Sequence, residues 1–190
     1  VPTRGISRSI EHNLGTVLEQ EWPEYQVYFA VESESDEGAP FLKKLCASHG
    51  NAHLIVAGQS RTCSQKIHNL LAGVAAAGDV DLLAFADNDV PLPSDWLARL
   101  AAPLDDPRMT VSTGFWRIWS RESGFAVQLQ IFFDRLLYAH FLAASSLGGG
   151  GFLWGGSFAI RRRDFETLGV VSRWAESVSD DMRSEERRVG

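Results

Sequence analysis

The stretch Asp81-Leu82-Leu83-Ala84-Phe85-Ala86-Asp87-Asn88-Asp89 is an apolar run that ends in two nearby carboxylates. Its uncharged part is typical of a buried β-strand, and the prolines that follow favour a loop. In open α/β sheets, ligands bind beyond the carboxyl ends of the strands. The two final aspartates therefore stand where chemistry is expected, and their oxygens can converge on one divalent cation. The alternative is an Asx-type turn, since Asp and Asn are favoured wherever strands end.

Further strands and helices are predicted to alternate along the chain. Apolar, β-branched or aromatic runs predict strands over residues 26–31, 53–57, 81–86, 109–115 and 152–161. Helical periodicity predicts helices over residues 7–20, 40–48, 64–77 and 94–102. Thr62 or Ser64 is the expected N-cap of the third helix, Gly78 its end, and Ser94 the N-cap of the fourth. This alternation predicts one α/β domain with a largely parallel sheet.

The composition of the chain argues against a nucleic-acid-binding protein, a disulfide-rich protein and a transmembrane helix within these residues. The 190 residues carry a net charge of −6, and their only dense basic run is Arg161-Arg162-Arg163, so a nucleic-acid partner is not expected. Cys46 and Cys63 are too few for a disulfide framework, which favours a reducing compartment. No run of 18 uncharged apolar residues is present to predict a transmembrane helix.

Residues 125–147 form an ambiguous segment, rich in Phe, Leu and Ala but containing Asp134, Arg135 and His140. Such charges are poorly tolerated inside a bilayer. Two interpretations stay open: a long, partly buried helix, or an interfacial helix that lies against a membrane with Phe and Leu on one face.

The third predicted helix opens with Gln65-Lys66-Ile67-His68-Asn69. Lys66 and Asn69 are three residues apart and share a helix face. The N-terminus of a helix attracts anions, and a lysine there favours a phosphate or sugar ligand. The alternative for Lys66 is a solvated surface charge. We expect His68 to pack or to form a hydrogen bond, and Cys63 not to act as a nucleophile.

A last acidic cluster is Ser179-Asp180-Asp181. Adjacent carboxylates repel each other, and burial of one would raise its pKa into the range of a general base. The alternative is an acidic helix start, in which Ser179 caps the helix and the aspartates interact with its dipole.

In their order along the chain, these motifs resemble a family 2-type GT-A glycosyltransferase of the ceramide glucosyltransferase-like branch, which includes ceramide and hopanoid glycosyltransferases. The resemblance spans residues 4–182 and rests on five motifs. They are Glu21-Trp22-Pro23-Glu24-Tyr25-Gln26-Val27, Gln65-Lys66-Ile67-His68-Asn69-Leu70, Phe85-Ala86-Asp87-Asn88-Asp89-Val90, Trp154-Gly155-Gly156-Ser157-Phe158-Ala159-Ile160-Arg161-Arg162 and Ser179-Asp180-Asp181.

The resemblance implies a truncated GT-A fold, with three α/β/α layers and a mostly parallel central sheet. It implies inverting transfer of a sugar from a nucleotide-diphosphate sugar, with UDP-sugar favoured, to a hydroxyl acceptor, with a lipid favoured over a polysaccharide. The resemblance implies a Mn²⁺ or Mg²⁺ site at Asp89 and Asp87, and donor binding by Lys66, Asn69, Asp87 and Glu32. It places Trp154, Gly155 and Gly156 on the side that binds the acceptor. It also implies that Asp181 and Asp180 form the catalytic pair.

The chain departs from the family pattern at one donor position. The aspartate that follows the second strand in many relatives is replaced by Ser33, between Glu32 and Glu34. Two other functions stay open on the sequence: a nucleotidyltransferase built on a similar sheet, and a non-catalytic module that binds sugar nucleotides.

The resemblance also implies a larger, membrane-associated enzyme with its catalytic domain on the cytoplasmic face, anchored by segments outside this chain. Residues 1–182 are expected to form a partial catalytic domain. Residues 183–190 follow it abruptly and resemble a translated sequencing adapter, which predicts a non-native tail; the alternative is a short charged helix.

Overall fold

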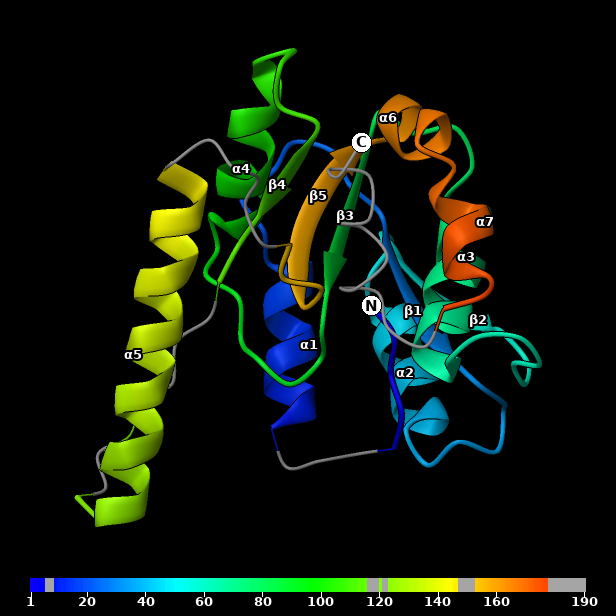
Figure 1. The fold of residues 1–190 in the computed structure, drawn as a ribbon. Helices are drawn as coiled ribbons and strands as arrows, with labels where there is room; N and C mark the ends of the chain where they lie inside the picture. The colour runs from blue at the N-terminus through cyan, green and yellow to red at the C-terminus, as the bar shows by residue number, and fades with distance from the viewer. Residues whose placement is uncertain (6–8, 116–119, 121–122, 147–152, 178–190) are drawn as a thin grey trace.

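The computed structural model describes residues 1–5, 9–115, 120, 123–146 and 153–177 (Figure 1). Strands β1 (Val27–Val31) and β2 (Ala52–Val56) form a parallel pair. Strands β3 (Leu82–Ala86), β4 (Val111–Thr113) and β5 (Ser157–Arg161) form a second sheet in the order β3-β5-β4. Because β5 is antiparallel to both neighbours, β3 and β4 run in the same direction. The parallel prediction thus holds for β1 with β2, and β5 is the antiparallel strand.

Helices cover both faces of these strands. Helices α1 (Ile10–Leu18) and α2 (Ala39–Ser48) pack on β1 through a cluster that includes Leu14, Phe29 and Leu42. Helices α3 (Gln65–Ala77), α6 (Arg162–Thr167) and α7 (Val170–Trp174) pack on β3 and β5. On the other face of β5, α4 (Trp96–Ala101) and the 3₁₀ helix η1 (Ala102–Asp105) contact Ala159. The expected α/β/α layering is therefore present.

The ends of α3 and α4 can be compared with the capping residues predicted from the sequence. The Ser64 hydroxyl accepts a hydrogen bond from the Ile67 amide at 3.3 Å, and Gly78 ends α3 with a φ of 65°, as predicted. The prediction for Ser94 is wrong. Helix α4 begins at Trp96, and the Ser94 hydroxyl instead donates to the Glu21 carboxylate at 2.6 Å, so this side chain joins two loops.

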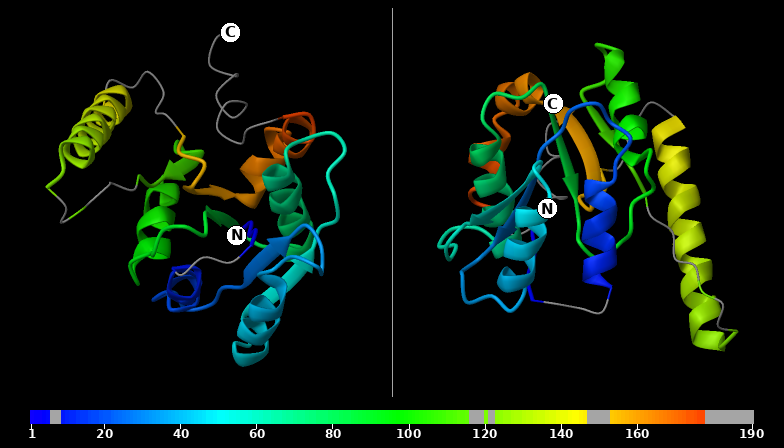
Figure 2. Two further views of the ribbon diagram at one scale, coloured as in Figure 1. Left: turned by 90° about the horizontal axis from the view of Figure 1, so that it is seen from below. Right: turned by 180° about the vertical axis from the view of Figure 1, so that it is seen from behind.

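Helix α5 (Phe125–Ser146) stands at the side of the domain, next to α4 and β4 (Figures 1 and 2). Its Tyr138 and Phe141 rings contact Phe115, each with ring centroids 5.3 Å apart. Most of its other large apolar side chains are exposed. Within the described residues, no helix combines the length and the apolar character needed to cross a membrane.

An aromatic cluster joins β3 and β5 to the last two helices. The Phe85 ring stacks on Phe158 with centroids 4.5 Å apart, and Trp174 contacts Phe85 and Phe165 edge-on. Phe165 and Trp174 are each 1% exposed. The cluster therefore fixes α6 and α7 against β3, the strand that leads into Asp87.

Replacing Phe165 by alanine is expected to lower the free energy of unfolding by about 3–5 kcal/mol, because the buried ring leaves a cavity. The matched control is Phe132→Ala on α5, where the ring is exposed. This control is expected to change stability by less than about 0.5 kcal/mol. Urea unfolding of both variants checks the difference, and equal losses would contradict the assignment of the core.

Candidate functional site

The candidate site forms where β3 ends. The Asp87 amide donates to the Gly156 carbonyl at 3.0 Å, which extends the β3–β5 ladder by one further bond. Asp87 is therefore fixed by backbone pairing, whereas Asp89, two residues later, is exposed on the loop. The two aspartates are thus presented differently, one at the strand end and one toward solvent.

Lys66 faces this strand end from the first turn of α3. Its Nζ lies 2.9 Å from Asp87 Oδ1 and 3.3 Å from Oδ2, so the ammonium contacts both carboxylate oxygens. About a third of each side chain is exposed. Lys66 is therefore more than a solvated surface charge: it places a cation beside the carboxylate at the open end of β3.

Gly156 makes room for the Asp87 carboxylate. A Cβ atom at Gly156 would lie 2.9 Å from Asp87 Oδ2 and 2.9 Å from Trp154 Nε1, closer than real Cβ atoms come. The absent side chain therefore allows the carboxylate and the indole to approach the same point of the backbone. Trp154 is half-buried, and its ring contacts Phe115, which links this side of the site to α5.

The loop after Asp87 is held by α1, a helix whose contact with the site was not predicted from the sequence. The buried Asn13 amide donates to the Asn88 carbonyl at 3.2 Å, and the Thr16 hydroxyl accepts from the Leu92 amide at 2.9 Å. One turn further, the Gln20 amide donates to the Pro93 carbonyl at 3.0 Å. The available sequence signal was the recurrence of Asn13, Thr16 and Gln20 at helical spacing.

Asn69 has a different environment from Lys66. It is 4% exposed; its Nδ2 donates to the Ala30 carbonyl of β1 at 3.2 Å, and its Oδ1 accepts from Gln65 Nε2 at 2.8 Å. Its amide thus joins α3 to β1, and its role in donor binding stays a prediction. His68 Nε2 lies 2.9 Å from the Ala57 carbonyl, in agreement with the expected hydrogen-bonding role.

The other predicted site residues lie around this centre or outside the described residues. Glu32 follows β1 directly and is half-buried, and Gly155 is buried beside Trp154. Asp180 and Asp181 lie outside the described residues, so their roles stay predictions. Within the part of the chain that the structure describes, no three His, Cys, Asp or Glu side chains converge into a metal cluster.

Comparison with models of known protein families identifies the family of this chain. The family model described as glycosyl transferase family 21 matches residues 1–187. The chain belongs to this family. This membership agrees with the resemblance to ceramide glucosyltransferases. A search of curated protein sequences gives no match.

A solved structure supports the fold of this family 21 chain. It is similar to a mannosyltransferase from Pyrobaculum calidifontis, whose structure is a complex with GDP-Man and Mn²⁺. The two share 22% sequence identity with a TM-score of 0.65 over 88% of this chain. The match covers 45% of the mannosyltransferase, so the family 21 chain spans less than half of that protein's length. The predicted GT-A fold is confirmed.

Gly156→Ala is expected to destabilise the family 21 chain by about 1–3 kcal/mol, because the new methyl group overpacks the Asp87 carboxylate and the Trp154 indole. The matched control is Gly15→Ala inside α1, where a Cβ would meet nothing within 4 Å. That substitution is expected to stabilise the chain by about 0.5–1 kcal/mol. Chemical unfolding measures both values, and a neutral Gly156→Ala would contradict the close packing of this site.

Proposed function

We propose that this chain carries the catalytic site of an inverting glycosyltransferase that moves a sugar from a nucleotide-diphosphate sugar, with UDP-sugar the favoured donor, to the hydroxyl group of a lipid. The observation that carries the proposal is Asp87, fixed at the end of β3 between the Lys66 ammonium and the open backbone of Gly156. Family membership supports the transferase class.

The donor diphosphate is assigned to the side of Lys66. The Lys66 ammonium can contact a phosphate oxygen, and the N-terminus of α3, capped by Ser64, adds the positive end of the helix dipole. Glu32 follows β1 and is proposed to contact the nucleoside. Both GDP and UDP donors belong in the test, since the similar structure holds GDP-Man.

The residues present fit a divalent metal. Asp87 and Asp89 supply hard carboxylate oxygens at the end of β3, where about a third of the Asp87 side chain is exposed and Asp89 lies on the surface. We assign Mn²⁺ or Mg²⁺ to these two residues. When bound, the metal neutralises negative charge on the leaving diphosphate.

Asp181 is proposed as the general base, with Asp180 beside it. Asp181 takes the proton of the acceptor hydroxyl while the acceptor oxygen forms a bond to the anomeric carbon. The bond from that carbon to the diphosphate breaks, and the configuration inverts. Base assistance of this kind contributes about 10²–10⁴-fold to rate. Trp154, Gly155 and Gly156 are proposed to form the acceptor wall, where the indole offers a face for stacking.

The exposed side of α5 is proposed to lie against the membrane that holds the lipid acceptor. Six of its exposed apolar residues recur at helical spacing and form one stripe: Phe125, Leu129, Phe132, Phe133, Leu136 and Leu137. Phe125 is 83% exposed, and a stripe of this kind is unusual on a surface that meets only water. An interfacial helix buries such a stripe at the headgroup boundary.

Two substitutions separate donor binding from chemistry. Asp89→Asn is expected to weaken binding of the nucleotide-sugar donor in the presence of Mn²⁺ by at least about tenfold, because a metal ligand loses its charge. Asp181→Asn is expected to leave donor binding nearly unchanged and to lower the transfer rate by about 10²–10⁴-fold. Calorimetric titration and release of nucleoside diphosphate measure the two effects.

Four results would contradict this assignment. Near-normal transfer by Asp181→Asn would exclude the base, and donor binding unaffected by Asp89→Asn or by a chelator would exclude the metal site. Release of pyrophosphate in place of nucleoside diphosphate would indicate a nucleotidyltransferase. Metal-dependent donor binding with no transfer to any acceptor would indicate a non-catalytic module.

The membrane proposal is tested by changing the stripe on α5. The double variant Phe132→Ser/Leu136→Ser is expected to lower binding to phosphatidylglycerol-containing vesicles by about tenfold, because two apolar side chains lose their burial. The control is Val171→Ser, which removes an exposed apolar residue from α7. Co-sedimentation with vesicles measures binding. Equal binding by the double variant and the unchanged chain would contradict the proposal.

A further inference from the structure

The end of β4 holds Trp154, the residue proposed to stack on the acceptor. The Thr113 hydroxyl accepts a hydrogen bond from the Trp154 amide at 3.0 Å and donates to the Ser157 carbonyl at 3.1 Å. Two residues later, the Phe115 ring contacts the Trp154 indole, with ring centroids 4.9 Å apart. One short segment therefore holds both the backbone and the side chain of Trp154.

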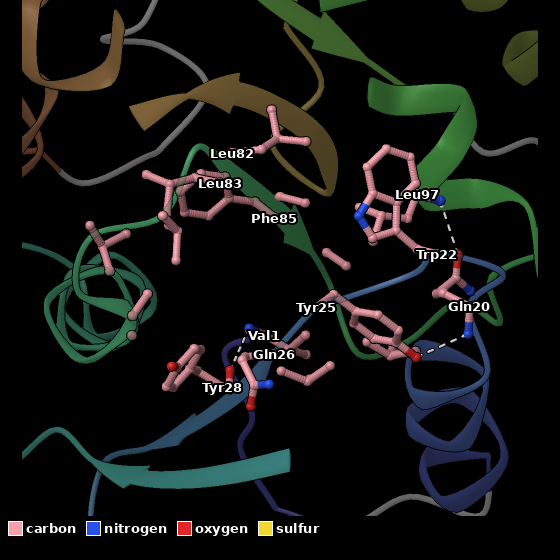
Figure 3. Close-up of a pocket in the computed structure, with 18 of the residues that line it drawn as sticks. Val1, Gln20, Trp22, Tyr25, Gln26, Tyr28, Leu82, Leu83, Phe85 and Leu97 are labelled. Carbon is pink, nitrogen blue, oxygen red and sulfur yellow. Dashed lines mark hydrogen bonds between the residues drawn. The ribbon is translucent and has the colours of Figure 1, made fainter. Parts of the chain in front are cut away.

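The turn that carries Trp154 is also fixed from the side of α4. The Ser157 amide donates to the Trp154 carbonyl at 3.1 Å, and the Ser157 hydroxyl accepts from the Trp96 indole at 2.9 Å. Helix α4, which begins at Trp96, is held by Gln20, whose side-chain oxygen accepts from the Leu97 amide at 2.9 Å (Figure 3). The turn under the Trp154 indole is therefore bonded on two sides.

The Trp154 indole lies next to the carboxylate at the end of β3. A Cβ atom at Gly156 would be 2.9 Å from Trp154 Nε1 and also 2.9 Å from Asp87 Oδ2, so these two atoms lie close to the same point. Trp154 is half-buried, which leaves part of its surface open to solvent. An indole in this place can stack on an acceptor whose hydroxyl group approaches a donor held at Asp87.

Helix α5 has two different faces. Between residues 125 and 143, the side chains that are not exposed recur at intervals of four and three residues and so share one face: Val127, Ile131, Asp134, Tyr138 and Phe141. By the same helical spacing, the exposed apolar stripe lies on the opposite face. Tyr138 and Phe141 contact the Phe115 ring, each with ring centroids 5.3 Å apart. Phe115 thus contacts both α5 and the Trp154 indole.

We propose that Thr113 and Phe115 are positioning residues for the lipid acceptor. Thr113 fixes the backbone of Trp154, and Phe115 fixes the orientation of its indole and joins the indole to α5. Both residues act through Trp154. The inference rests on the proposed function, in which α5 lies against the membrane and Trp154 stacks on the acceptor. A hydroxyl lipid presented by the membrane then meets an indole whose position is fixed relative to the helix that lies on that membrane.

Two substitutions at Thr113 test the backbone contact in the full 190-residue chain. Thr113→Val keeps a β-branched side chain but removes the hydroxyl group, whereas Thr113→Ser keeps the hydroxyl group. Thr113→Val is expected to speed hydrogen exchange of the Trp154 amide by about fivefold or more, and Thr113→Ser by less than about twofold. The Ile160 amide, inside the β3-β5-β4 sheet, is the internal reference. Equal exchange of the Trp154 amide in both variants would overturn the proposal.

A lipid probe tests the effect of both residues on the acceptor. The chain is labelled with fluorotryptophan, and the fluorine NMR resonance of Trp154 is identified with the variant Trp154→Phe. Phosphatidylglycerol vesicles that carry hexanoyl ceramide, which has free hydroxyl groups, are expected to shift this resonance beyond any change caused by the same vesicles without ceramide. The ceramide content at half-maximal shift is the measured quantity.

Thr113→Val and Phe115→Leu are each expected to raise this half-maximal ceramide content by at least about tenfold, because a small displacement of a positioning group weakens its effect strongly. Thr113→Ser is expected to behave like the unchanged chain. The second control is Met109→Ala, an exposed residue just before β4. Co-sedimentation is expected to show equal vesicle binding by all variants, because none of them changes the exposed stripe of α5.

The outcomes separate this inference from the proposed function. An equal ceramide response in Thr113→Val, Phe115→Leu and the unchanged chain would overturn the positioning role alone. A loss shared by Thr113→Ser and Thr113→Val would also overturn it, because the hydroxyl group would not be the cause. A Trp154 resonance that shows no response to ceramide in the unchanged chain would contradict the acceptor wall of the proposed function, and the positioning role with it.

Discussion

The hydrogen-bonded ladder between β3 and β5 is the constraint on which the site depends. The ladder continues past the end of β3 to the bond between the Asp87 amide and the Gly156 carbonyl. The Asp87 carboxylate is therefore fixed at the end of this strand. Behind this ladder, the aromatic cluster of Phe85, Phe158 and Trp174 prevents the two strands from shifting. Asp87, the residue that the proposed chemistry depends on, is therefore held by a rigid pair of strands. Helix α3 can then place the Lys66 ammonium against its carboxylate.

Helix α1 extends this constraint from the strand to the loop that follows it. The side chains of Asn13 and Thr16 in α1, and of Gln20 just after it, bond to backbone groups between residues 88 and 97. The loop that carries Asp89 is therefore held at several points. Buried polar groups need partners, and here the loop backbone supplies them. The loop keeps a defined path without regular secondary structure, which lets Asp89 reach solvent while Asp87 stays in the ladder.

Sequence patterns located most of the secondary structure because hydrophobic periodicity and turn residues are local signals. They predicted the Ser64 cap and the glycine that ends α3, both of which the structure shows. Ser94 was misassigned because its hydroxyl finds Glu21, a residue far away in the chain. Asn69 was paired with Lys66 by helical spacing, yet tertiary packing turns its amide inward to the Ala30 carbonyl. In both cases the side chain bonds to a residue far away in the chain, Glu21 or Ala30, in place of the local role predicted for it.

The sequence alone determined the class of fold, the strand that leads into Asp87 and the order of motifs that resembles a glycosyltransferase. These features depend on the spacing of residues along one segment, which a sequence contains in full. Only the tertiary structure decided that Lys66 contacts Asp87, that Gly156 must lack a side chain, and that α1 holds the loop. It alone also showed that β1 pairs with β2 whereas β3 pairs with β5, because strand neighbours are set by long-range pairing and side-chain packing rather than by local sequence.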